Sequence, residues 1–475
     1  MKKYIIVLLF VVSFSVIKAH ETWVHWYITA RAFELLELYY EKHGGDKNLL
    51  NEIRGKIYFY NGYATPRYNE IVDRGKPFMS LYPLMTGVMA EDYEDVVYEY
   101  DRFDDSGIMQ VLSHFWRPDS GVGSYNTFSL YPYGSYPNSL MKANDILFGG
   151  NFFIRHQIVY KGRDIYGILV DKESIIELYK GKYKIKGYYY DSSGIYRFMS
   201  DSTFLFEDVG LNSKDVAYKL LGHVLHLLED MSVPAHVRII EHPCIMGLQD
   251  DYELWVGGIS CGGSEPEEFK AKEILSNNNV NIDIGRMLWD FNYNNDIEFI
   301  YNVFYTIAEI SDFFPAGSSN MFFNTIKQGN DYLPAGANEY INDVYKKNEL
   351  YNIKKFDNSI LTQIAINTLP YVVAATASVI YWFGIRTNQV NCQYTFYESL
   401  LHNDIEEEEI KILYNDGNID IWASKKGNII IYDVMGRLLI SEEVRDRFLK
   451  IPINCRLPLM YQYVCNNKVK TGVIR

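Results

Sequence analysis

The segment Leu220–Val237, LLGHVLHLLEDMSVPAHV, constrains this chain more than any other. It predicts a helix that ends before Pro234, because proline cannot continue a helix and disfavours the helical conformation in the preceding residue. His226 and Asp230 are then four residues apart and lie on one face of that helix. The following turn presents His236. Two imidazoles and a carboxylate around one helix end can bind a divalent metal, whereas a lone His–Asp pair more often belongs to a packed core.

Length and charge narrow the class of protein. The chain has 475 residues, 48% of them hydrophobic, which is enough for two or three globular domains. The net charge of -14 argues against tight nucleic-acid binding, because duplex affinity depends mainly on basic contacts to phosphate. It does not exclude a nuclease whose metals hold the phosphate. Of the five cysteines, Cys244 with Cys261 and Cys455 with Cys465 could pair in an oxidising compartment; the absence of a CxxC pair argues against a cysteine zinc site.

Residues 1–19 have the pattern of a signal peptide. Lys2 and Lys3 form a charged start, Tyr4–Ile17 is apolar, and Ala19 is a small residue before the expected cut. The apolar run is short for a membrane span. We therefore expect export to the periplasm and a mature chain that begins at His20.

Hydrophobic periodicity predicts a mainly α-helical domain over residues 20–388, with insertions at about 120–200. Helical spacing of apolar residues predicts helices at His20–His43, Leu84–Val96, Asp296–Phe314 and Ile360–Gly384. The apolar run within the last of these is short for a membrane span and contains polar residues, so it predicts a buried helix. Short alternating runs in Asp145–Tyr196 indicate a small β insertion.

The last part of the chain has a different pattern. A linker is expected at 389–409, followed over 410–475 by six or seven short strand-like runs. Turn signals such as Asn415–Asn418 separate the runs. This pattern predicts a small β-sandwich.

Five segments in order resemble the secreted zinc-dependent phospholipases C, a family that shares a superfamily with fungal zinc-dependent single-strand nucleases. The segments are His25–Ala32, Gly87–Glu94, Ser113–Asp119, His226–His236 and Asp251–Glu253. Each is weak alone, whereas the ordered set is specific, and the resemblance spans roughly residues 20–384. It implies a multi-helix, mainly α catalytic domain.

The resemblance also implies two zinc ions. The implied ligands of the first are Asp92, His114, His226 and Asp230. The second would share Asp230 and use His25 with the backbone amine and carbonyl of His20, although family members usually begin with tryptophan. His223 lies on the same helix face as Asp230 and fits a packed core histidine somewhat better than a residue that supports a ligand.

A third zinc implied by the resemblance has an incomplete ligand set. His236 and Glu253 would hold it, but the family has a histidine four residues before this glutamate, where this chain has Gln249. A remodelled loop could supply Asp250 or His242 instead. Occupancy of the third site is therefore open.

The chemistry implied is hydrolysis of a phosphodiester by metal-activated hydroxide. Asp92 would orient the water or take its proton, and Tyr93 would contact a cationic headgroup by a cation–π interaction. Phospholipase C acting on glycerophospholipid headgroups at a membrane surface is the favoured activity, with no stable nucleic-acid partner. The alternatives are a single-strand nuclease or nucleotidase, and a metal-stabilised surface adhesin without activity, which the glutamine at position 249 suggests. The sequence leaves the oligomeric state open.

The C-terminal segment resembles the sorting domains of type IX-secreted proteins from Bacteroidetes-like bacteria. The matching runs are Asn428–Leu439, Leu457–Val464 and Lys468–Arg475. The resemblance implies the type IX secretion machinery as a partner, and release or anchoring at the cell surface. A carbohydrate- or surface-binding β-sandwich is the alternative.

Overall fold

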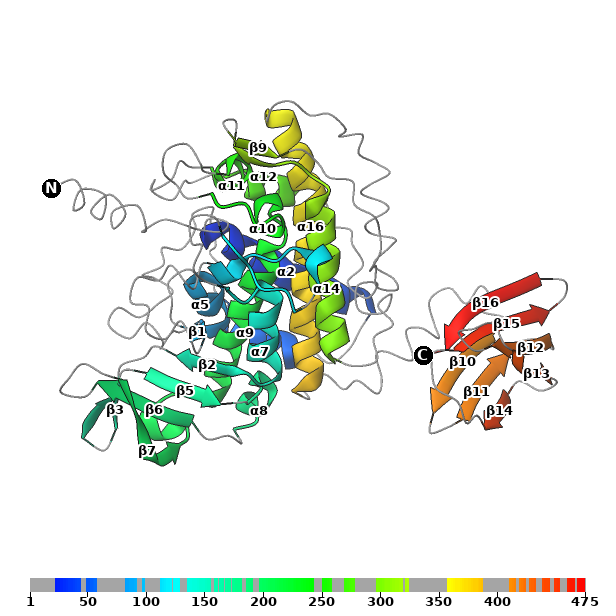
Figure 1. Ribbon diagram of the computed structural model, residues 1–475, viewed down its shortest axis with the longest axis horizontal. Helices are drawn as coiled ribbons and strands as arrows, with labels where there is room; N and C mark the ends of the chain where they lie inside the picture. Colours follow the sequence, from blue (N-terminus) through cyan, green and yellow to red (C-terminus); the bar gives the residue numbers. More distant parts are fainter. Residues whose placement is uncertain are drawn as a thin grey trace. The chain divides into compact units, whose positions relative to one another are not determined.

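The computed structural model describes the chain as two units, Met1–Asn391 and Cys392–Arg475 (Figure 1). Apart from short gaps inside these ranges, the structure describes residues 22–57, 82–98, 112–242, 250–258, 269–277, 296–323, 357–387 and 410–474. The predicted signal peptide and linker lie outside these residues.

The first unit is mainly α-helical, which confirms the predicted fold class. Its longer helices are α2 (Thr22–His43), α7 (Ser139–Phe148), α9 (Ser213–Asp230), α14 (Asp296–Asp312) and α16 (Asn358–Arg386). The shorter ones are α3 (Asn48–Arg54), α5 (Pro83–Ala90), α8 (Ile175–Tyr179), α10 (Pro234–Val237), α11 (Asp251–Gly257) and α12 (Lys270–Asn277). The described residues also include the 3₁₀ turns η3 (Leu112–His114), η4 (Pro118–Ser120) and η5 (Glu207–Val209).

Helix α9 lies at the centre of this unit and packs against α2, α5, α7, α8 and α16 (Figure 1). Its crossing with α5 is unusually close because both helices have a glycine at the contact. A Cβ atom on Gly87 would lie 1.8 Å from the Lys219 carbonyl oxygen, and one on Gly222 would lie 2.2 Å from the Leu84 carbonyl oxygen. The absence of both side chains lets the α5 backbone approach α9 closely enough for the Val88 carbonyl oxygen to contact Nδ1 of His226.

Helix α16 is the one described helix that is long and apolar enough to cross a membrane, but 78% of its apolar window is buried within the protein. It packs against α2 and α14. This helix is therefore part of the core, as predicted for its apolar run.

A five-stranded antiparallel sheet is inserted into the helical unit. Its strands, in spatial order, are β1 (Val96–Tyr98), β2 (Asn151–Ile154), β5 (Gly167–Asp171), β6 (Ile185–Tyr190) and β7 (Tyr196–Phe204). Two small hairpins pair β3 (Ile158–Tyr160) with β4 (Arg163–Ile165) and β8 (Ala316–Ser318) with β9 (Met321–Phe323).

The prediction of a helix over Leu84–Val96 was wrong at its C-terminal end. Helix α5 ends at Ala90, and Val96 begins β1, where it pairs with Ile154 of β2. The β-branched residues of β1 pair with a strand more than 50 residues later, and such pairing is invisible to a local helical pattern.

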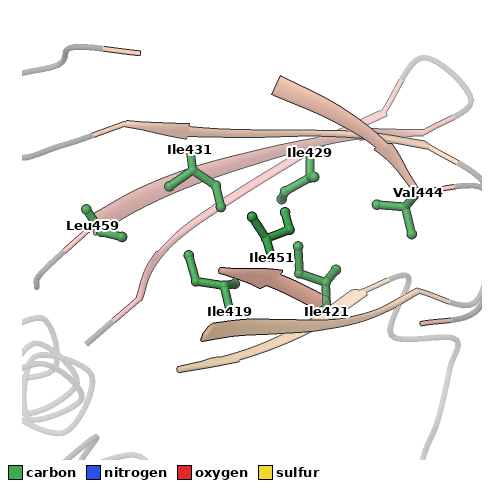
Figure 2. Close-up of a cluster of buried hydrophobic side chains, with 7 residues drawn as sticks. All are labelled: Ile419, Ile421, Ile429, Ile431, Val444, Ile451 and Leu459. Carbon is green, nitrogen blue, oxygen red and sulfur yellow. The ribbon is translucent and has the colours of Figure 1, made fainter. Parts of the chain in front are cut away.

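The second unit consists of two facing antiparallel sheets, which confirms the predicted β-sandwich. One contains β10 (Ile410–Asn415), β11 (Asn418–Ala423) and β14 (Phe448–Pro452). The other contains β13 (Leu438–Val444), β12 (Gly427–Tyr432), β15 (Leu459–Cys465) and β16 (Lys468–Ile474). Figure 2 shows the apolar side chains that fill the space between the sheets: Ile419, Ile421, Ile429, Ile431, Val444, Ile451 and Leu459. They alternate along the strands, so one face of each sheet is apolar.

Candidate metal centre

The carboxylate of Asp230, the last residue of α9, is fully buried among three histidines. Its Oδ1 lies 3.4 Å from Nε2 of His25, and its Oδ2 lies 3.0 Å from Nδ1 of His114 and 3.6 Å from Nε2 of His226. The imidazoles come from α2, η3 and α9, so three separate elements converge on one carboxylate. Potential ligand atoms of His25, His226 and Asp230 all lie within 4.8 Å of one another.

In two of these rings, the nitrogen that faces away from Asp230 contacts a hydrogen-bond acceptor, and this contact fixes the orientation of the ring. Nδ1 of His226 lies 2.7 Å from the Val88 carbonyl oxygen, and Nδ1 of His25 lies 2.9 Å from Oε2 of Glu229. A carbonyl oxygen can only accept, so His226 carries its proton on Nδ1 and directs the Nε2 lone pair at Asp230. Burial lowers the pKa of His226 well below its usual value, which keeps the ring neutral. A neutral imidazole beside a carboxylate is the ligand form that a metal requires.

A second buried carboxylate, that of Glu91, lies behind His114. Oε1 of Glu91 is 3.5 Å from Nε2 of His114, and the Glu91 carboxylate also contacts Nζ of Lys142 and Nδ1 of His223. Burial raises the pKa of Glu91, but Lys142 and the two imidazoles lower it more, so it lies well below its usual value. Burial lowers the pKa of His114 to about 4. The contact with Glu91 makes His223 a residue that supports the site rather than an apolar-core histidine.

A second cluster lies directly after α9 and consists of His236, His242 and Glu253. Nε2 of His236 is 3.0 Å from Oε1 of Glu253, and Nε2 of His242 is 3.1 Å from Oε2. Their Nδ1 atoms face backbone carbonyls, at 3.2 Å and 2.6 Å respectively. Both rings therefore direct Nε2 at the Glu253 carboxylate, where a bound cation would take the place of a proton on Nε2. Among the described residues, no hydrogen bond satisfies His236 Nε2, His242 Nε2 or Glu253 Oε1, and a shared cation would satisfy all three.

The turn between the two histidines explains why His242 reaches Glu253. Ile239 has φ 55°, a left-handed conformation that a β-branched residue rarely adopts. Its side chain packs against the apolar cluster around Phe115, which also stacks on the His236 ring at a centroid distance of 4.5 Å. Burial lowers the pKa of His242, but Glu253 and Asp250 raise it more, to about 9.

Asp250, the other candidate for the missing ligand, has a structural role instead. Its Oδ1 accepts a hydrogen bond of 3.0 Å from the backbone N–H of Glu253, and its Oδ2 accepts one of 2.9 Å from the N–H of Gly317. It therefore caps α11 and anchors β8. Of the two alternatives for the position of Gln249, the geometry favours His242.

The two clusters adjoin one another. Nδ1 of His236 lies 4.0 Å from Oδ1 of Asp230, and its hydrogen-bond partner is the carbonyl oxygen of His114. His114 thus presents its side chain to the first cluster and its backbone to the second. The structure brings together the described members of the predicted ligand set: His25, His114, His226, Asp230, His236 and Glu253.

Several residues singled out in the sequence lie outside the described residues: His20, Asp92, Tyr93 and Gln249 of the site, and Cys244, Cys261 and Cys455 of the two possible disulfides. Conversely, sequence reasoning did not identify Glu91, Lys142 or Glu229. Glu91 and Glu229 directly precede predicted ligands, Asp92 and Asp230, and that adjacency is the signal that could have drawn attention to them.

No family model and no curated protein matches this chain. Among solved structures it is similar to alpha-toxin of Clostridium perfringens from avian strain SWCP, with 10% identity, a TM-score of 0.32, and coverage of 96% of this chain and 93% of the toxin. It is also similar to alpha toxin from Clostridium absonum, with 10% identity, a TM-score of 0.34, and coverage of 95% and 91%. At these values the similarities assign neither a family nor an activity, so the functional argument depends on the residues of the site.

Proposed function

We propose that this protein is a secreted zinc-dependent phosphodiesterase, with phospholipase C as the favoured activity. The observation that carries the proposal is the pair of adjacent buried clusters. In each cluster, imidazole nitrogens face carboxylate oxygens, and the second nitrogen of each ring contacts another hydrogen-bond acceptor. Carboxylates and neutral imidazoles in this arrangement repel one another unless protons or cations lie between them.

The donor set fits zinc better than it fits calcium or magnesium. Zinc binds imidazole and carboxylate readily, whereas the harder cations prefer sites built from oxygen alone. One ion would use Asp230, His114 and His226, together with Asp92, which is carried over from the family resemblance. A second would use Asp230 and His25 with the mature N-terminus, also carried over. A third would use His236, His242 and Glu253.

When bound, zinc lowers the pKa of water to near neutrality and neutralises the charge of a phosphodiester. The residues of this chain have three tasks around it. Asp230, with one oxygen near His25 and the other near His114 and His226, would help to hold two ions. As the family resemblance implies, Asp92 would orient the attacking water or take its proton, and Tyr93 would contact a cationic headgroup by a cation–π interaction.

The lipid assignment rests on charge. A net charge of -14 disfavours a polyanionic substrate more than a zwitterionic lipid, since repulsion grows with substrate charge. A single-strand nuclease of the same chemistry is the second candidate. The adhesin hypothesis depended on the absent histidine at position 249; the contact of His242 with Glu253 offers a substitute ligand there and therefore favours the enzymatic proposal.

We also propose export by the signal peptide and delivery to the cell surface by the type IX machinery through the C-terminal β-sandwich. The support is the sequence resemblance of residues 428–475 together with the compactness of this unit.

The test is metal analysis and turnover on the mature protein beginning at His20. We expect two to three zinc ions per chain, and hydrolysis of phosphatidylcholine vesicles that a chelator abolishes and zinc restores. Faster turnover of single-stranded DNA than of lipid would replace phospholipase with nuclease. Zinc binding without turnover of either substrate would overturn the enzymatic proposal.

A further inference from the structure

Glu229 is a buried carboxylate that has no role in the proposed chemistry. It lies next to the first cluster, which consists of Asp230 and the three histidines around it. It lies on α9 directly before Asp230 and is fully buried. Oε2 lies 2.9 Å from Nδ1 of His25, on the side of the ring opposite the Asp230 contact. Glu229 therefore contacts the predicted ligand His25 from the side away from the metal site and is not itself a predicted ligand.

Two hydroxyl groups hold this carboxylate in place. Thr29 of α2 donates to Oε1 at 2.8 Å, and Thr376 of α16 donates to the same oxygen at 3.4 Å. Three helices therefore meet at one carboxylate, which leaves it little freedom to rotate. Its partners among the described residues are these two hydroxyls and His25, and none of them is a lysine or an arginine.

The carboxylate behind His114 has a different environment. Glu91 has the ammonium of Lys142 against it, so a cation of the protein itself balances its charge. Among the described residues, the partners of Glu229 are two hydroxyl donors and one imidazole, and burial raises the pKa of Glu229 well above its usual value. A dication bound between His25 and Asp230 would supply the positive charge that balances Glu229.

We propose that Glu229 is the positioning residue of the second metal site: it holds His25 with Nε2 directed at the cation, and it supplies a negative charge that raises the affinity for that cation. This inference rests on the metal centre that the proposed function requires, and it goes further by assigning a determinant of affinity to a residue outside the ligand set. When Nε2 of His25 binds a metal, the remaining ring proton lies on Nδ1, and Oε2 of Glu229 is its acceptor. Removal of such a partner typically weakens metal binding by about 10- to 100-fold.

Two substitutions separate the two contributions. Glu229→Gln keeps an acceptor for His25 but removes the charge, whereas Glu229→Ala removes both. Thr376→Val is the matched control, because it removes a hydroxyl donor to the same carboxylate and leaves the charge and the His25 contact intact.

The experiment uses the full mature chain with Co²⁺ as the probe, titrated against a competing chelator and followed by visible absorption. We expect Glu229→Gln to lower the affinity for one of the two cobalt ions of the first cluster by about 10-fold. Glu229→Ala should lower that affinity by up to about 100-fold and should also alter the cobalt absorption spectrum. Thr376→Val should lower the melting temperature with unchanged affinity, and the cation at His236, His242 and Glu253 should remain in every variant.

Two outcomes would overturn the inference. Wild-type affinity in both Glu229 variants would remove its role at the metal. Equal weakening in Thr376→Val and Glu229→Gln would show that the helix junction, not the carboxylate, supports the site. A protein that binds cobalt as expected but hydrolyses neither lipid nor nucleic acid would refute the proposed function and leave this inference standing.

Discussion

Replacing Asp230 with asparagine tests the centre of the site. The side chain keeps its shape and loses one negative charge among three imidazoles, whose nearest nitrogens lie 3.0–3.6 Å from its oxygens. At an effective dielectric constant of about 20, a unit charge about 4 Å from another contributes about 4 kcal/mol. Since 1.4 kcal/mol corresponds to tenfold in affinity, we expect Asp230→Asn to weaken zinc binding by about three orders of magnitude.

The effect on stability should reverse when zinc is removed. With zinc present, Asp230→Asn should melt at a lower temperature than the wild type, because less metal stabilises the folded state. With a chelator present, the variant should be at least as stable as the wild type, because a buried carboxylate without a cation costs free energy. Differential scanning fluorimetry in both conditions, with zinc content measured by mass spectrometry, gives the comparison.

Asp215→Asn is the matched control. Asp215 lies on the same helix, is 42% exposed and pairs with Lys56, so its removal should change stability by no more than about 1 kcal/mol and leave zinc content unchanged. Wild-type zinc content and turnover in Asp230→Asn would refute the placement of the metals at this carboxylate.

Four further predictions address the scaffold and the ends of the chain. Gly222→Ala should destabilise the protein by at least about 1–3 kcal/mol and reduce zinc affinity in a chelator competition, whereas Gly55→Ala, whose Cβ would meet only an ordinary contact at 3.5 Å, should not affect the metal. A chain that ends at Thr387 should keep full zinc content and turnover but remain inside the cell envelope in a fractionation experiment; loss of zinc would refute the division. An extra methionine before His20 should reduce turnover and remove one zinc ion. His20→Trp should retain turnover and zinc content, since only backbone atoms of that residue are proposed ligands. Equal activity with and without the extra residue would exclude the terminal amine as a zinc ligand. As the pH falls from about 6.5 to about 4, zinc-free wild type should lose more stability in urea titrations than zinc-free His114→Gln, because the pKa of His114 is lowered to about 4 and the unfolded chain then binds the additional proton. The variant corrects for Asp250, whose pKa is raised by burial to about 7 and whose effect has the opposite sign; equal slopes in the two proteins would contradict the burial of His114.

Local patterns predicted much of this architecture. Helix α9 and the turn after it follow from apolar spacing and from Pro234, both of which act within a few residues. The strands of the C-terminal unit follow from alternation, as at Ile419 and Ile421 with Asp420 between them, because one residue in two enters the core. The ligands His226 and Asp230 could be paired from sequence because they lie one helical turn apart.

Long-range contacts account for what the sequence did not predict. Whether Glu229 is exposed or buried depends on α2 and α16, and its contact with His25 joins residues 204 positions apart. The choice between His242 and Asp250 depends on the left-handed conformation of Ile239, which its residue type disfavours. Backbone hydrogen bonds from Ile239 to His236 and from Ile240 to Ala235 close that turn, and the apolar cluster beside it packs against the Ile239 side chain. That packing joins segments far apart in the sequence, so no short segment predicts it.

The close crossing of α5 and α9 links the fold to the chemistry of the site. The missing Cβ atoms of Gly87 and Gly222 allow the α5 backbone to approach, and the Val88 carbonyl then reaches Nδ1 of His226 at 2.7 Å. The same approach brings the end of α5, with Glu91, against His223 one turn earlier on α9. Two ring orientations thus depend on one helix–helix distance. A side chain at either glycine should therefore weaken metal binding before it disturbs the apolar core, because hydrogen bonds to His226 and His223 fail over a few tenths of an ångström, whereas apolar contacts fade gradually.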